Sequence, residues 1–243
     1  MRRTDPQKLA RIAGWLFILT FVTSIPAALL YGPVLNHHDY VTGGGHDTQI
    51  ALGAFLELLL VIANIGTAVA LYPIVKRQSE SLSVSYIASR ILESTVIVIG
   101  IVSVLTMVKL RRDLAGSPGV DHASLILAGR QLVAFHDWTF LFGPSFCAAF
   151  GNGILLGTLM YRSGLMPRRL ALLGVIGGPL AFLAATGALF DLYDQNSAAQ
   201  GLLTVPEIFW ELSVGIYLIV KGFRAAGLES LGIRATRAGF EYS

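Results

Sequence analysis

Long runs of hydrophobic residues, separated by short polar segments, are the main pattern along this chain. An α-helix of about 20 apolar residues crosses the hydrocarbon core of a bilayer. Six segments meet this requirement: Ile12–Leu35, Ile50–Val75, Val84–Val108, Trp138–Tyr161, Leu170–Leu192 and Leu202–Val220. The pattern therefore predicts six membrane-spanning helices, of which the last is the shortest.

Helices are the only structures that fit these runs. Open strands would leave backbone groups unsatisfied in lipid, and the runs are too long and unbroken for barrel strands. The first run follows basic residues, as in a signal peptide, but it exceeds the apolar region of about 7–15 residues that such peptides have. We therefore expect an uncleaved first helix and an all-α, polytopic six-helix bundle.

The polar connections differ in length and character. The longest is 109–137, in which Gly116–Gly119 predict a turn. Within the same connection, Ser124–Phe135 is amphipathic and predicts a short helix at the outer membrane interface. We predict that residues 1–224 form one transmembrane domain and that residues 225–243 form a flexible cytoplasmic tail.

Composition supports a membrane protein. Hydrophobic residues make up 54% of the 243 residues and charged residues 14%, whereas a soluble domain has about 25% charged residues. This balance excludes a soluble enzyme, a disordered protein and a nucleic-acid binder. The single cysteine, Cys147, excludes an internal disulfide and a cysteine-based zinc site.

The distribution of Lys and Arg predicts the orientation. With the N-terminus in the cytoplasm, the inside segments hold thirteen of these residues: Arg2, Arg3, Lys8, Arg11, Lys76, Arg77, Arg162, Arg168, Arg169, Lys221, Arg224, Arg234 and Arg237. The outside segments hold four: Lys109, Arg111, Arg112 and Arg130. The positive-inside rule then places both termini in the cytoplasm, with Lys109, Arg111 and Arg112 as a local exception.

Several polar residues lie within the apolar runs, where each charge costs about 2.5–3.5 kcal/mol on insertion scales. From the rise of about 1.5 Å per residue, we expect one outer layer that contains Glu57, His136, Asp137 and Glu207. Deeper positions are expected for Asn64, Arg90, Glu93, Asn152 and Glu211.

Arg90 is the only basic residue within the six runs. Glu93 lies three residues further along and shares its helix face, and Glu211 is the expected partner on the sixth helix. These groups either hold the third and sixth helices together through ion pairs or line a cavity for a ligand or proton. Glycines in the fourth and fifth runs predict close helix packing.

Metal binding and nucleophilic catalysis have little support. Imidazole and carboxylate groups can bind metals, and His136, Asp137, Glu57 and Glu207 supply them, but the chain has no HExxH or ExxH motif. The loop histidines are His37, His38 and His46. No GxSxG motif occurs, and we predict no cofactor and no metal.

One motif and several isolated residues resemble a known family. The segment LLGTLMYRSGLMPRRL (Leu155–Leu170) is similar to the loop between the fourth and fifth helices of the bacterial membrane family called domain of unknown function 4386. Further matches are Glu57, Leu71–Tyr72, Arg90, Glu93, His136, Glu211–Leu212 and Lys221–Gly222. Glu207 has no counterpart in the pattern. The resemblance implies a six-helix bacterial membrane protein and no established activity.

Three functions remain open at this point. We favour a non-enzymatic protein of the bacterial cytoplasmic membrane that binds or moves a small apolar or amphipathic molecule through the polar layer. One alternative is an intramembrane enzyme acting on a lipid, with His136 and Asp137 or Glu57 as acid–base groups. The other is an accessory or assembly protein with purely structural buried charges. Membrane lipids are the expected partners.

Overall fold

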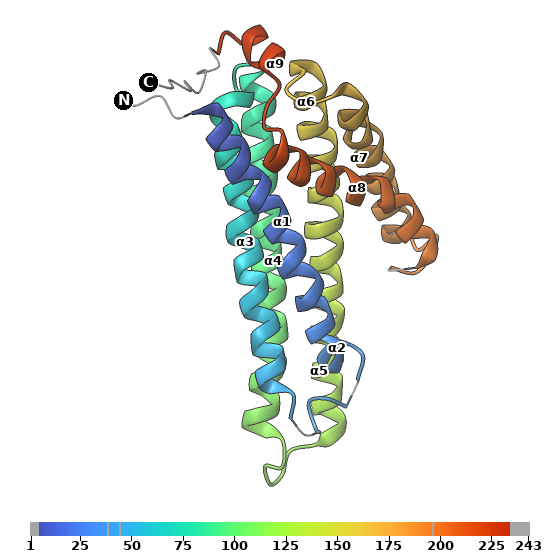
Figure 1. Cartoon of the computed structure of the whole chain (residues 1–243). Coiled ribbons are helices and arrows are strands. Elements are labelled where there is room, and N and C mark those ends of the chain that lie inside the picture. The colour runs from blue at the N-terminus through green and yellow to red at the C-terminus, as the bar shows by residue number, and fades with distance from the viewer. Residues whose placement is uncertain (1–4, 38, 44, 196, 234–243) are drawn as a thin grey trace, which may run out of the picture.

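The structure is a computed structural model that describes residues 5–37, 39–43, 45–195 and 197–233. Helices dominate these residues, and no β-strand occurs among them. Six helical segments are long and apolar enough to cross a membrane (Figure 1). The predicted all-α architecture with six spans is therefore confirmed.

The spans follow one another along the chain with short connections. In order, they are α1 (Pro6–Leu30), α3 (Asp47–Val75), α4 (Glu80–Leu114), the composite segment His122–Ser163, α7 (Arg168–Leu189) and α8 (Ala198–Val220). Two short helices, α2 (Gly32–Leu35) and α9 (Ala225–Ser230), follow the first and last spans.

Local sequence signals set the helix ends. The carboxylate of Asp5 accepts a hydrogen bond from the backbone N–H of Gln7 (2.9 Å) and caps α1. Gly164 adopts a left-handed conformation with φ of +64° after the last residue of the fourth span, and Pro167 directly precedes α7. The YRSGLMPRR segment thus forms the sharp helix-to-helix connection that its glycine and proline predict.

The fourth span differs from the prediction. It comprises α5 (His122–Phe140), two π-helical segments, η1 (Leu141–Cys147) and η2 (Ala149–Leu156), and α6 (Gly157–Ser163). The separate interfacial helix predicted at Ser124–Phe135 is not confirmed, because α5 continues through these residues into the span. Asp121 caps the start of α5, and no proline interrupts it before Pro144 in η1.

The helices form two sets of contacts that share α1. In the first set, α3 packs against α1 and α4, and α4 packs against α5. In the second set, α8 packs against α1, α7 and η2. Figure 1 shows α7 and α8 beside the end of the bundle that holds the start of α1 and the short helix α9, while α3, α4 and α5 extend well past them at the other end. Because of this offset, residues of α8 lie beside a different part of α3, α4 and α5 than they would if all the helices were level with one another.

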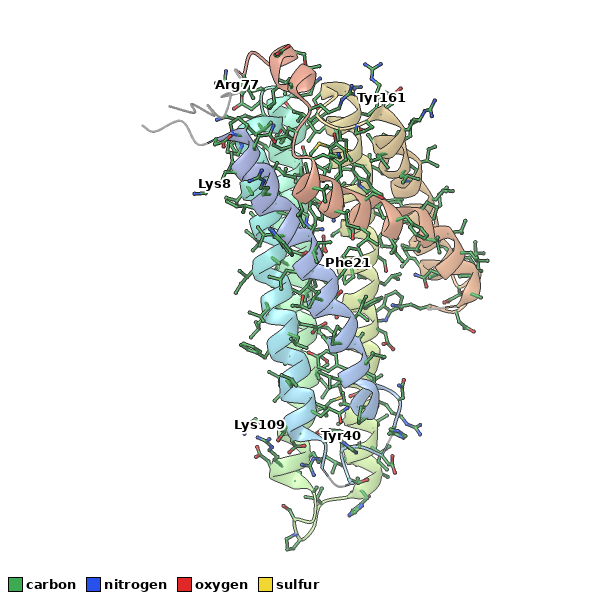
Figure 2. All side chains as sticks on the ribbon, viewed as in Figure 1. Lys8, Phe21, Tyr40, Arg77, Lys109 and Tyr161 are labelled. Carbon is green, nitrogen blue, oxygen red and sulfur yellow. The ribbon has the colours of Figure 1, made fainter. Side chains whose placement is uncertain are left out.

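Apolar side chains cover the outside of the bundle. Trp15, Leu29 and Ile62 expose 62%, 75% and 65% of their surfaces, as expected where lipid replaces water. Charged side chains gather near the two ends: Figure 2 places Lys8 near one end and Lys109 near the other. The distribution agrees with six spans embedded in a membrane.

The segment that directly follows α8 packs against the bundle. Leu228 of α9 is fully buried, and the backbone N–H of Arg224 donates to the carbonyl of Leu165 (2.8 Å). The start of the segment predicted as a flexible tail therefore forms a helix that packs against the connection between α6 and α7. Residues 234–243 of that tail lie outside the described residues.

Arg111 and Arg112, two of the basic residues that depart from the positive-inside pattern, share an acidic partner. Arg111 and Arg112 both form ion pairs with Asp47 at the start of α3, and the hydroxyl of Tyr40 donates to the same carboxylate (2.8 Å). Burial and this carboxylate raise the pKa of Tyr40 to about 12, so its hydroxyl stays a donor at neutral pH. The two arginines tie the start of α3 to the end of α4, and Arg111 also donates to the carbonyl of Gly43 in the loop after α2 (3.2 Å).

The topology yields a first prediction. In a Cys147→Ala background, we expect a membrane-impermeant maleimide to label a Gly43→Cys variant in intact cells. The matched Gln78→Cys variant, in the connection between α3 and α4, should react only after permeabilisation, because the two loops lie at opposite ends of the bundle. Labelling of both variants from the same side would contradict the arrangement.

Candidate functional site

A buried ion pair lies at the centre of the bundle. Nη1 of Arg90 lies 2.5 Å from Oε2 of Glu93, one turn further along α4. Asn64 of α3 completes the group, since it accepts from Arg90 and donates to the second oxygen of Glu93 (3.1 Å). All three residues are at most 4% exposed. The predicted pairing of Arg90 with Glu93 is confirmed.

A second set of hydrogen bonds links this group to the fourth and sixth spans. The hydroxyl of Tyr86, on α4, donates to Oδ1 of Asn152 in η2 (3.2 Å) and lies 3.4 Å from the hydroxyl of Thr67 on α3. Asn152 donates to Oε1 of Glu211 (2.5 Å), and its backbone carbonyl accepts from Nε1 of Trp210 (2.8 Å). Polar contacts therefore join α3, α4, η2 and α8.

Glu211 does not form the predicted ion pair with Arg90. The guanidinium of Arg90 is already bonded to Glu93 and Asn64, and the carboxylate of Glu211 bonds to Asn152 instead. The two charges still interact electrostatically through the network. The polar connection between α4 and α8 is thus indirect, because the neutral amide of Asn152 lies between Tyr86 and Glu211.

Among the described carboxylates of the site, Glu207 has the fewest hydrogen-bond partners. Its side chain is 4% exposed, and neither carboxylate oxygen has a hydrogen-bond partner among the described residues. It lies against glycines of two neighbouring helices: a Cβ added to Gly153 would come within 2.6 Å of its Oε2, and one added to Gly177 within 2.8 Å of its backbone nitrogen. The predicted close packing at these glycines is therefore present.

The carboxylates of α8 line a cleft. This cleft has a volume of about 330 Å³ and lies between η1, η2, α7 and α8. Phe140, Pro144, Ala181 and Ile208 supply apolar wall, and Thr204, Glu207 and Glu211 supply polar groups. The arrangement offers a partly open cleft with apolar walls and two carboxyl groups at one side.

The predicted outer layer is only partly present. The hydroxyl of Tyr31 donates to Glu57 (2.8 Å), and the ring of Tyr31 makes an edge contact with His136 (5.9 Å between centroids). Glu207 is not part of this group: it interacts electrostatically with Glu211, Arg90 and Glu93. The depth estimate is wrong for Glu207 because α8 packs beside the other end of the bundle.

Asp137 is set apart from both groups. Its side chain is 54% exposed, and its Oδ1 lies 4.0 Å from Nδ1 of the buried His136. The backbone carbonyl of Asp137 accepts from Gln195 in the connection between α7 and α8 (3.0 Å). The residue therefore lies at the edge of the bundle rather than in a polar interior.

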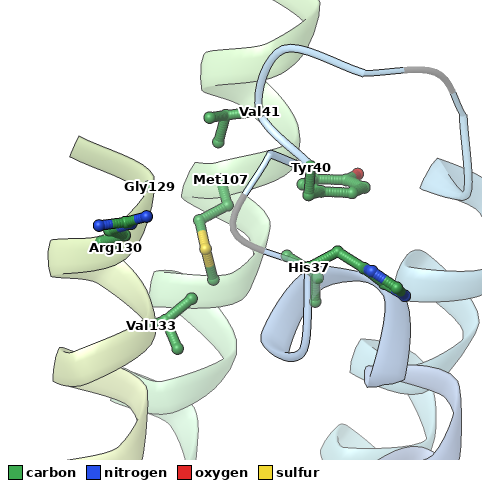
Figure 3. Close-up of a pocket in the computed structure, with 8 residues that line it drawn as sticks. His37, Tyr40, Val41, Met107, Gly129, Arg130 and Val133 are labelled. Atoms are coloured by element: carbon green, nitrogen blue, oxygen red, sulfur yellow. The ribbon is translucent and has the colours of Figure 1, made fainter. Parts of the chain in front are cut away.

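The described residues contain no group of three or more His, Cys, Asp and Glu side chains arranged for a metal ion. Of the loop histidines, His37 borders a small cavity of about 10 Å³ with Tyr40, Met107 and Arg130 (Figure 3). His46 precedes α3, and His38 lies outside the described residues. The small cavity holds space for about one water molecule.

Sequence reasoning missed four side chains of these groups. Tyr31, Thr67, Tyr86 and Trp210 read as ordinary apolar or weakly polar residues within long hydrophobic runs. The available signal was the position of buried hydroxyl and indole groups inside apolar helices, since such groups need partners there. Which partners they find depends on helix packing that the sequence does not reveal.

Six apolar helices around a buried polar network define a polytopic α-helical membrane protein. A family model described as a domain of unknown function, DUF4386, matches residues 12–222. The chain therefore belongs to this family, as the YRSGLMPRR segment predicts. No curated protein and no solved structure matches the chain.

The buried ion pair gives a second prediction. Removing one member of a buried pair costs about 3–5 kcal/mol because the other charge is left uncompensated. We expect Arg90→Gln to lower the melting temperature in detergent clearly, and Glu93→Gln in the same chain to recover part of the loss.

The surface pair Lys109–Asp113 supplies the control. Its side chains are 76% and 53% exposed, and exposed pairs contribute about 0–1 kcal/mol. Lys109→Gln should therefore change the melting temperature little. Equal effects of Arg90→Gln and Lys109→Gln would contradict a structural role for the buried pair.

Proposed function

We propose that this protein binds or moves a small amphipathic molecule through the cleft between η1, η2, α7 and α8. The cleft itself carries the proposal. Its volume of about 330 Å³ lies at the lower end of the range of about 300–1,000 Å³ for small-molecule sites. Such sites combine apolar walls with a few polar groups that fix orientation, as this one does.

The irregular backbone beside the cleft supports the proposal. π-Helical turns occur often at functional sites, and η1 contributes Pro144 and Ser145 and η2 contributes Ala149 to the cleft wall. Interrupted helices also mark binding sites in transporters. The same segment holds Asn152, which links the cleft to the buried ion pair.

A lipid-directed enzyme is the second candidate, with His136 as its central group. Nδ1 of His136 is buried without a hydrogen-bond partner among the described residues, so it could take part in proton transfer. Its neighbours support catalysis less well, because Glu57 is bonded to Tyr31 and Asp137 is largely exposed. We therefore rank binding or transport above lipid chemistry.

We infer a location in the bacterial cytoplasmic membrane with both termini in the cytoplasm. The end of the bundle with the start of α1 and with α9 carries basic residues of three connections: Lys76, Arg77, Arg162, Arg168, Arg169, Lys221 and Arg224. The positive-inside rule supports this orientation. Each such residue gains about 1 kcal/mol from anionic lipid, which makes lipid headgroups natural partners.

Blocking the cleft provides the test. A side chain at Gly201 has room, since a Cβ added there meets no heavy atom within 4 Å, and Gly201 lines the cleft. We expect native mass spectrometry of the wild-type protein, purified in a mild detergent, to show a bound small molecule. Gly201→Trp should lose it.

Ala199→Trp is the matched control, because Ala199 is exposed on the same turn of α8 and does not line the cleft. This variant should keep the bound molecule. If Gly201→Trp retains the same adduct as the wild type, the molecule binds elsewhere and the proposal is wrong. If the wild type carries no small molecule, an accessory role with structural buried charges is favoured instead.

A further inference from the structure

Among the carboxylates of the buried site, Glu207 is the one without a polar partner. Glu93 bonds to Arg90 and Asn64, and Glu211 bonds to Asn152. Both oxygens of Glu207 lack a hydrogen-bond partner among the described residues, although the side chain is 96% buried, being 4% exposed. A buried polar group normally has a partner, so its environment points to a missing one.

Among the residues that the structure describes, no basic side chain forms an ion pair with this carboxylate. Three glutamates, Glu93, Glu207 and Glu211, interact with the single positive charge of Arg90, which is bonded to Glu93 and Asn64. With all four groups ionised, the cluster carries two negative charges in excess. A cation beside Glu207 would reduce this excess and satisfy the carboxylate.

The cleft is the opening that adjoins Glu207, although both carboxylate oxygens are buried behind its surface. The carboxylate of Glu207 lies against the bare backbone of Gly153, and the backbone of Glu207 lies against Gly177. These helix contacts close the sides toward η2 and α7. The residue lines the cleft together with Glu211, one turn further along α8.

The cleft wall determines which kind of cation fits. A divalent metal needs about six oxygen ligands, whereas much of this wall is apolar. An organic group can contact Pro144, Ala181 and Ile208, and the ring of Phe140 can attract a cation through its face. An anion would meet two carboxylates and no basic side chain in the cleft lining.

We propose that the cleft binds an amphipathic organic cation, with an ammonium group beside Glu207 and the apolar part against the wall that Phe140 and Ile208 form. This inference rests on the proposed function and names its ligand class. It assigns a role to the residue that the family resemblance does not cover.

A pair of isosteric probes separates charge from shape. Benzyltrimethylammonium carries a permanent positive charge, and neopentylbenzene has the same shape with carbon in place of nitrogen. We expect radiolabelled benzyltrimethylammonium to bind the full chain in lipid nanodiscs. Neopentylbenzene and the anion phenylmethanesulfonate should compete at least about tenfold more weakly, because the positive charge of the probe attracts the Glu207 carboxylate although its nitrogen donates no hydrogen bond.

Substitutions of single glutamates test which carboxylate attracts the cation. Glu207→Gln keeps the size of the side chain and should weaken binding of benzyltrimethylammonium by about tenfold or more. Glu80→Gln removes one negative charge at an exposed position at the start of α4 and should leave binding within about twofold, since water and salt screen exposed charges. Glu207→Asp keeps the charge and should keep the preference for the cation. This variant also supplies the test if Glu207→Gln folds poorly.

The outcomes distinguish this inference from the proposed function. If neopentylbenzene competes as well as the cation and Glu207→Gln changes nothing, the ligand class is wrong while the cleft remains a binding site. If Gly201→Trp leaves binding of the cation unchanged, the probe binds elsewhere and this inference is overturned. If the cation does not bind although the wild type carries a cleft-bound molecule by mass spectrometry, only the ligand class fails.

Discussion

The compensation of one buried positive charge is the constraint on which the interior of this protein depends. Arg90 lies where neither water nor lipid headgroups can solvate it, so protein groups must provide its polar contacts. Glu93 provides the opposite charge, and Asn64 bonds to both partners. This requirement fixes the rotation of α3 relative to α4, because Asn64 and Arg90 have to face each other.

Close helix packing makes the rest of the network possible. Gly153 and Gly178 let η2 and α7 approach backbone to backbone, and Gly174 receives the indole of Trp210. Trp210 then reaches the carbonyl of Asn152. Lipid tails are as apolar as the helices themselves, so such small-residue contacts and buried hydrogen bonds hold a membrane bundle together. The polar site and the packing of α7 and α8 thus depend on the same residues.

The sequence predicted the spans well because their length and apolarity are one-dimensional properties. It also predicted the partner of Arg90 on its own helix, since a spacing of three residues fixes the shared face. Contacts between helices were harder to predict. The position of Glu207 depends on the offset of α8, and the bond of Glu211 to Asn152 depends on the π-helical backbone of the fourth span. Neither feature has a local signal in the sequence.

The wide turns of η1 and η2 also constrain how sequences of this kind can change. In a π-helix each hydrogen bond spans five residues rather than four, so the segment contains more residues per turn than the helices on either side. Converting η1 and η2 to an ordinary α-helix would change the rotation of α6 relative to α5, because an α-helix turns by about 100° per residue and a π-helix by less. The buried face of α6, with Leu159 and Met160, would then turn away from its neighbours. Substitutions are therefore far easier to accommodate in this span than changes in its length.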